Sequence, residues 1–225
     1  MGQKKLLILR LEGVLQAWDA SSKWDERSTE DFPTKSGIVG LLGCAMGLER
    51  GDPALTALSD ACVMAVRADR KGELLRDFQT VTGNPLRNAE GKPKTTGNTI
   101  ISNRSYLQDA CFTVVMETSE EWHTRITEAL KAPKWCLYLG RKTCVPSRPV
   151  LECEDPPYGS LEEALRSYPS AERAELPMMY ETELQDDALP NYTRPDALAD
   201  PNRGFFQRRI WRGVLKEGEH VSDQN

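Results

Sequence analysis

Basic side chains gather in two stretches of the sequence that contain no acidic residue, 131–148 and 203–216. Lys and Arg at this density can bind phosphate groups, and a local basic stripe is the electrostatic footprint of many nucleic-acid-binding proteins. The competing interpretation is a solvated face without a ligand, which is the commoner outcome for any single stripe. The residues are Lys131, Lys134, Arg141, Lys142 and Arg148 in the first stretch, and Arg203, Arg208, Arg209, Arg212 and Lys216 in the second.

A third place suited to an anion is the tripeptide Thr34-Lys35-Ser36. Pro33 prevents a continuous helix, so a helix is expected to begin just after it, with Thr34 or Ser36 as its N-cap. The free N–H groups at a helix N-terminus, together with Lys35, would suit a phosphate. Four glycines then follow at spacings of three or four. We interpret them as a flat stripe that packs closely against the rest of the fold.

Residue patterns that mark enzymes are scarce. The sequence has two histidines, His123 beside two glutamates and His220 in a polar tail, and neither has a nucleophile nearby. It contains no nucleophile-elbow, zinc-protease or P-loop motif. None of the six cysteines forms a C-x-x-C pair, so we expect buried free thiols rather than a metal site or a disulfide framework. The residues favour binding over catalysis and predict neither a metal nor a cofactor.

The elements that must position these residues follow in the order strand, helix, strand, arm, strand, helix, strand. Apolar runs at 6–11 and 62–67 predict strands, with the glycine-striped helix between them. The stretch 83–104 is too polar to bury itself and is expected to project as an arm. Strands are expected again at 106–117 and 135–139, with a helix between them. The order is βαββαβ, so the predicted fold class is α+β, ferredoxin-like or RRM-type, with a long insertion between the second and third strands.

The chain changes character in its last third. Residues 152–200 carry 13 acidic side chains against 3 basic ones, whereas the part before them is slightly basic. We therefore predict one domain over 1–148 and a small β-rich C-terminal domain over 149–225, with strands at 176–182 and 205–215. The sequence has no run of eighteen apolar residues and no signal-peptide pattern, so we expect a cytoplasmic protein without a membrane partner.

Five blocks of the sequence, in order and at their spacing, resemble the CasD subunit family of the type I-E CRISPR Cascade complex, within the RAMP superfamily. The C-terminal third matches this family only loosely, around residues 208–211. The blocks are LRLEGVLQAW at 9–18, FPTKSGIVGLLG at 32–43, RDFQTV at 76–81, RSYLQDA at 104–110 and YLGRKTC at 138–144.

The resemblance implies a non-catalytic scaffold with an RRM-like RAMP domain, a small C-terminal domain and a β-hairpin thumb, which corresponds to the arm at 83–105. Members of this family cap the 5′ handle of the CRISPR RNA and join the backbone filament subunit to the large subunit. The implied partners are therefore CRISPR RNA, these Cascade subunits and, near the thumb, target DNA. The residues expected to contact RNA are Lys35, Ser36, Arg104, Tyr106, Arg141 and Lys142, together with Arg27 and Lys94.

Two alternatives stay open at this point. The type I-C relative, which resembles this fold, cuts precursor CRISPR RNA without a metal, using a tyrosine where this chain has Lys35 and a lysine–histidine pair. This sequence contains no Lys-His pair, so an endoribonuclease is the weaker hypothesis. The second alternative is a protein-only adaptor whose basic stripes match the acidic surface of a partner, and it predicts negligible affinity for RNA.

Overall fold

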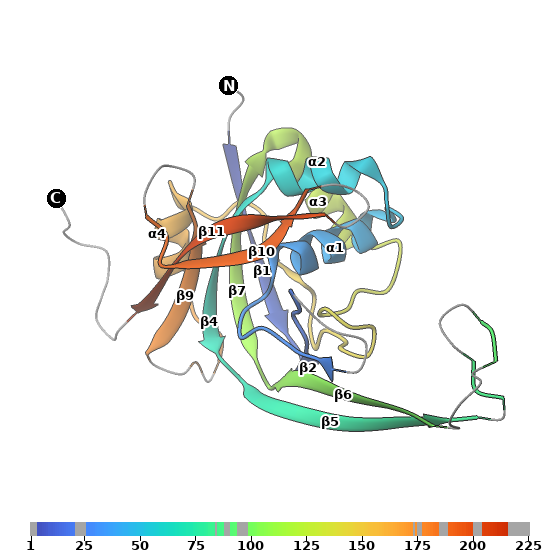
Figure 1. The fold of residues 1–225 in the computed structure, drawn as a ribbon. Helices are drawn as coiled ribbons and strands as arrows, with labels where there is room; N and C mark the ends of the chain where they lie inside the picture. The colour runs from blue at the N-terminus through green and yellow to red at the C-terminus, as the bar shows by residue number, and fades with distance from the viewer. Residues whose placement is uncertain are drawn as a thin grey trace.

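Figure 1 shows the fold as a computed structural model, which describes residues 4–20, 26–83, 85–87, 91–93, 99–172, 174, 177–184, 189–199 and 204–215. In these ranges the protein is a mixed α+β structure with four helices and two sheets, and the strands pair mostly antiparallel. None of the described helices has the length and apolar character needed to cross a membrane.

The larger sheet has seven strands and forms the body of the molecule. Alternate residues of its apolar strands enter two separate cores, since Leu7, Leu9 and Leu11 belong to one and Ile8 to the other. This burial on both faces explains why the first strand is a nearly continuous apolar run. The strand order is β10 (Tyr192–Leu198), β11 (Phe205–Leu215), β9 (Met178–Glu183), β4 (Val63–Arg70), β7 (Cys111–Ser119), β1 (Lys4–Glu12) and β8 (Leu151–Cys153).

Three helices cover one face of this sheet, and a fourth covers the other (Figure 1). Each begins at the residue that local capping chemistry predicts, because the side chains of Thr34, Asp52, Ser119 and Ser160 all accept a hydrogen bond from a backbone N–H of the first turn. The helices are α1 (Lys35–Met46), α2 (Pro53–Ala61) and α3 (Glu120–Lys131) on the first face, and α4 (Leu161–Ser167) on the second.

The smaller sheet is built on a long hairpin. Strands β5 (Glu73–Thr82) and β6 (Thr99–Gln108) pair antiparallel over ten positions and extend away from the body (Figure 1). Two short strands, β2 (Leu15–Gln16) and β3 (Glu26–Arg27), pair with the base of β6. The hairpin therefore covers a longer part of the sequence than the arm expected at 83–105, because its strand pairing begins at Glu73. Lys94 lies outside the described residues.

Two details of the predicted topology were wrong. Residues 135–139 form no strand, because Leu139 enters the core from a loop whose backbone is bonded to Cys144 and Ala17. The strand next to β1 is instead β8, which follows that loop. The strand β10 was not expected from the sequence.

The C-terminal strands belong to the larger sheet rather than to a sheet of their own. Strand β9 pairs with β4, matching Ala65 with Thr182 and Arg67 with Tyr180. Strands β11 and β10 then extend the same sheet outward. The division into residues 1–148 and 149–225 stays a prediction, and it is not a division between sheets.

Candidate nucleic-acid interface

An open cleft of about 680 Å³ runs along α1. Its helical wall includes Ser36, Gly40 and Cys44, which recur every four residues and therefore lie along one side of the helix, and Leu48 just beyond the helix end also lines it. The rest of the lining comes from Arg50, shortly after α1, and from segments distant in sequence, namely Trp18, Arg27, Trp135, Tyr138, Arg141 and Phe205. The cleft thus combines aromatic and basic side chains, which is the composition that suits single-stranded nucleic acid.

The turn opposite α1 is held by backbone contacts. The Leu139 N–H donates to the Cys144 carbonyl at 2.7 Å, and the Ala17 N–H donates to the Leu139 carbonyl at 3.1 Å. Gly140 has φ 84°, and a Cβ at this position would collide with the Ala17 carbonyl. Only glycine combines this conformation with so close an approach. The turn that carries Tyr138 and Arg141 is therefore fixed in place beside the cleft.

Arg141 is the centre of a cluster that gathers four of the residues expected to contact RNA. Its guanidinium donates to the carbonyls of Ser105, Arg27 and Ser28 at 2.9–3.0 Å, and it lies over the Tyr106 ring at 4.8 Å from the centroid. Arg27 is paired with Arg104 where β3 meets β6. All three acceptors of Arg141 are neutral, so its positive charge is not cancelled by them and still acts on the cleft.

Lys35 has a different environment from the one expected. Its side chain is buried, and its ammonium lies 2.8 Å from one Glu183 carboxylate oxygen and 3.1 Å from the other. Its backbone N–H donates to Asp196 at 2.8 Å. The first turn of α1 therefore already has a carboxylate and the Thr34 hydroxyl as acceptors, where a bound phosphate was anticipated. Lys35 does not line the cleft, whereas its neighbour Ser36 does.

Lys142 is exposed beside the cleft. Of the eight residues expected to contact RNA, three line the cleft, three are set around it, one is buried behind it and one is undescribed. The lining residues are Arg27, Ser36 and Arg141; Arg104, Tyr106 and Lys142 adjoin them; Lys35 is the buried one, and Lys94 the undescribed one. The structure does not test their contact with RNA, which stays a prediction.

Two arginines of the second basic stretch, Arg208 and Arg212, form ion pairs within the protein, whereas Arg203 and Lys216 lie outside the described residues. Arg208 holds Asp196 with two hydrogen bonds of 2.8 Å, and both side chains are buried. Arg194 and Glu181 form a similar pair at 2.8 Å. Burial alone would lower the pKa of Arg194, but the adjoining carboxylates, Glu181 above all, raise it well beyond its usual range. Arg212 also donates to Glu181, at 2.6 Å.

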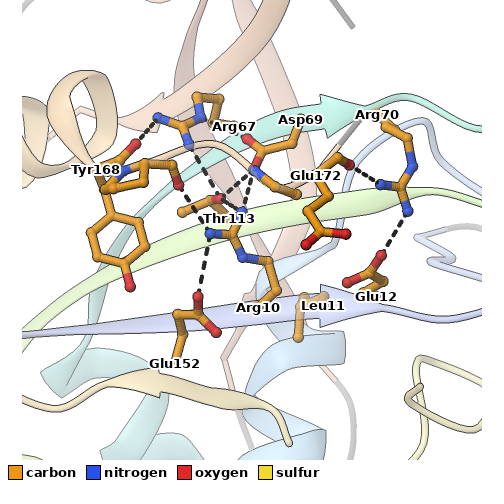
Figure 2. Close-up of polar contacts among 12 residues, drawn as sticks. Arg10, Leu11, Glu12, Arg67, Asp69, Arg70, Thr113, Glu152, Tyr168 and Glu172 are labelled. Carbon is orange, nitrogen blue, oxygen red and sulfur yellow. Dashed lines mark hydrogen bonds and ion pairs between the residues drawn. The ribbon is translucent and has the colours of Figure 1, made fainter. Parts of the chain in front are cut away.

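A second buried network, missed from the sequence, lies on the opposite face of the sheet (Figure 2). Arg10 and Arg67 point from neighbouring regions of the sheet toward the carboxylate of Asp69, which also accepts from Thr113 at 2.9 Å. Arg67 donates to the carbonyls of Leu165 and Tyr168 at 2.6 and 2.9 Å. The network therefore fastens the segment after α4 to the sheet. The sequence feature that could have predicted this network is the presence of one arginine inside each of two apolar strands.

The described residues contain no group of three or more His, Cys, Asp or Glu side chains placed to hold a metal. His123 lies on α3, with its Nε2 2.7 Å from the Glu154 carbonyl. All six cysteines are described and none forms a disulfide; Cys136 is exposed and Cys153 half-buried, whereas the other four are buried as expected. Burial raises the pKa of the Cys44 thiol, which therefore faces the cleft in its protonated form at neutral pH.

The fold and the cleft define a mixed α+β protein with a basic and aromatic groove. Known proteins similar to this chain agree with that class. The profile of the family described as CRISPR-associated protein (Cas_Cas5) matches residues 6–219. The chain belongs to this family, and the relationship predicted from the five sequence blocks is confirmed.

Two of the similar proteins are named as parts of CRISPR complexes. The chain is 37% identical over 159 residues to "CRISPR system Cascade subunit CasD" of Escherichia coli (strain K12). The alignment covers 65% of this chain and 70% of the relative. A solved structure titled "CRISPR RNA-guided surveillance complex" contains a similar chain, with TM-score 0.79, 30% identity, and coverage of 94% of this chain and 90% of that one. Another, "Crystal structure of Cas protein", has TM-score 0.72, 33% identity and coverage of 94% and 95%.

Proposed function

We propose that this protein is a non-catalytic subunit of a type I-E CRISPR surveillance complex, in which it binds and caps the 5′ handle of the CRISPR RNA. In this proposal it also joins the backbone filament subunit to the large subunit, in the cytoplasm. The observation that carries the proposal is the cleft along α1, where Arg27 and Arg141 meet Ser36. The hydrogen-bond acceptors of the Arg141 side chain are all neutral carbonyls, so its charge remains available to attract phosphate.

The fold offers further support for the finer details. The strand order β8-β1-β7-β4, with helices after the first and third strands, is the arrangement of the βαββαβ, ferredoxin-like or RRM-type fold. The β5–β6 hairpin overlaps the segment 83–105 that the resemblance assigns to the thumb, which supports that assignment. It exposes large apolar side chains on both of its faces, which suits contact with a neighbouring subunit. These side chains are Leu74, Leu75, Phe78, Val81, Ile100 and Ile101.

The test begins with co-purification. The full chain is expressed with tagged Cascade subunits, and the RNA in the purified complex is sequenced; we expect one short RNA species with a uniform 5′ end. The double variant Arg50→Glu and Lys142→Glu reverses two exposed charges at the cleft and should lower RNA retention at least tenfold. Arg125→Glu, an exposed change on α3, is the matched control and should retain RNA normally. Retention unaffected by the double variant would contradict the placement of RNA in this cleft.

Two other results would replace the proposal by one of its alternatives. Incubation of the purified protein with repeat RNA in the absence of metal should leave the RNA intact, and site-specific cleavage would establish an endoribonuclease instead. A complex that assembles normally but holds no RNA through this subunit would establish a protein-only adaptor. The steep salt dependence expected of phosphate contacts separates the scaffold from the adaptor.

A further inference from the structure

We propose that Gly40 is the floor of a base-stacking subsite, in which one unstacked nucleobase of the RNA lies against the bare backbone of α1 and faces Trp135 and Tyr138. This inference rests on the proposed function, which places RNA in the cleft. It goes beyond that function by naming which part of the RNA, a single nucleobase, binds in the cleft and which residues bind it.

Gly40 differs from the other glycines of α1 because an added Cβ would meet no neighbour among the described residues. A Cβ at Gly37 would lie 2.9 Å from Trp18, and a Cβ at Gly43 would lie 2.5 Å from Leu55, so packing explains both. Gly47 ends the helix in the left-handed conformation, with φ 73°. A Cβ at Gly40 would meet nothing within 4 Å, although the residue is in the middle of a helix and lines the cleft. Glycine in a helix interior lowers stability, and no contact within the described protein offsets that loss here.

The loop after α3 supplies aromatic surface to the cleft; its segment 134–136 is hydrogen-bonded to Ala45 and Cys44 of α1. Trp135 is 42% exposed and Tyr138 half-buried, and both line the cleft. Their exposed rings offer a surface on which a nucleobase can stack, because every base has a flat π-face. The turn that carries Tyr138 is fixed by the backbone contacts of Leu139 and Gly140, so at least this platform is in place before a ligand binds.

The charges around the cleft favour RNA over an apolar protein segment as the occupant. Arg50 and Arg141 line the cleft beside these aromatic rings, and Arg27 lines it as well. The cleft therefore offers cations for phosphates and a flat floor facing rings for a base, which is the pattern of single-strand recognition. Because Gly40 has no side chain, the cleft is deeper above it by about the thickness of a side chain. A planar base fits a space of this shape more closely than a branched side chain of a protein partner does.

The decisive variant is Gly40→Leu, because the proposal gives it opposite effects on two measurements. Replacing glycine in a helix should raise the melting temperature of the full chain, by about 2–4 °C for a protein of this size. The same side chain fills the slot and should weaken RNA binding in the assembled complex about tenfold. Thr124→Leu, at an exposed position of α3, is the control, with a similar gain in helix propensity and unchanged RNA binding. A lower melting temperature for Gly40→Leu would overturn the proposal, because the space would then not be open.

Stacking itself is read from 2-aminopurine placed in turn at purine positions of the repeat-derived RNA. One position should be quenched in the wild-type complex, remain quenched in Trp135→Phe, and recover its fluorescence in Trp135→Ala and in Gly40→Leu. Trp135→Ala should also weaken RNA binding about tenfold. If Arg50→Glu with Lys142→Glu releases RNA while the Trp135 and Gly40 variants change neither affinity nor fluorescence, the subsite is wrong and the proposed function stands. If the wild-type complex holds no RNA, both fail.

Discussion

The two basic stretches of this chain look alike in sequence but differ in the surroundings of their central residues; at the ends of the first stretch, Lys131 and Arg148 are paired with Glu154 and Glu152. In residues 131–148, Arg141 is bonded to three neutral carbonyls and Lys142 is exposed. In residues 203–216, Arg208 is buried against Asp196, and the half-buried Arg212 is paired with Glu181. Within the described residues, the charges of Arg141 and Lys142 in the first stretch therefore remain uncompensated at the cleft. The charges of Arg208 and Arg212 in the second stretch are compensated by carboxylates within the sheet.

The difference comes from the acidic segment that precedes the second stretch. Glu181 lies on β9 and Asp196 on β10, both next to β11 in the same sheet, so their carboxylates meet Arg212 and Arg208 at short range. Net charge over a window of sequence cannot reveal this pairing. A basic stripe indicates a phosphate site only when no carboxylate is folded against it.

The largest expected effect is the loss of Asp196. Asp196→Ala leaves the buried Arg208 without its carboxylate and the Lys35 N–H without its acceptor. Removing one partner of a buried ion pair costs about 3–5 kcal/mol, so urea unfolding of the full chain should show a loss of that size. The control is Asp31→Ala, which removes an exposed partner of Arg212 and should cost less than about 1 kcal/mol. Equal losses would contradict the distinction between buried and surface pairs.

A smaller effect on stability is expected at Arg141. Arg141→Lys keeps the charge but cannot reproduce the planar fork that reaches three carbonyls, and Arg141→Met loses both. Both variants should lose about 1.5–3 kcal/mol of unfolding free energy. Only Arg141→Met should also flatten the salt dependence of RNA binding by the complex. If Arg141→Lys flattens it equally, the hydrogen bonds and not the charge are what RNA requires.

Matched single changes compare the two stretches directly. Lys142→Gln removes an exposed charge beside the cleft, and Arg212→Gln removes a charge that Glu181 already compensates. In plots of log affinity for single-stranded repeat RNA against log salt concentration, the slope should fall by about 0.7 for Lys142→Gln. It should stay unchanged for Arg212→Gln. The opposite pattern would assign RNA to the second stretch.

The smallest effect concerns the exposed Cys136, which lies next to Trp135. Its thiol should react with iodoacetamide before the four buried cysteines do, as measured by mass spectrometry of the native protein. Bound RNA should slow this reaction a few-fold, because it covers the neighbouring cleft. Faster reaction in the presence of RNA would mean that RNA opens this wall instead of covering it.

Local rules of sequence predicted the helices and failed for the charged contacts. Thr34, Asp52, Ser119 and Ser160 each bond within their own first turn, so a short window contains the whole cause of each helix start. The environment of Lys35 has its cause 148 and 161 residues away, in Glu183 and Asp196. No local pattern contains that information.

The cleft was predictable only in part for the same reason. Ser36 and Arg141, in separate sequence blocks, were both expected to contact RNA, and both line the cleft. Leu139 was misplaced in a strand because an apolar run serves a strand and a buried loop equally well. Gly40 was grouped with its neighbours, since the empty space that distinguishes it exists only in three dimensions.

The carboxylate of Asp196 at the start of α1 has a consequence for the order of events during synthesis. The helix emerges from the ribosome early, but the residue that caps its first amide follows 161 positions later. Strand β11, which holds that carboxylate through Arg208, comes later still. Contacts so distant in sequence form late, because a long loop must close first. The wall of the cleft is therefore completed only after most of the chain has been made, which delays its competence to bind a ligand until then.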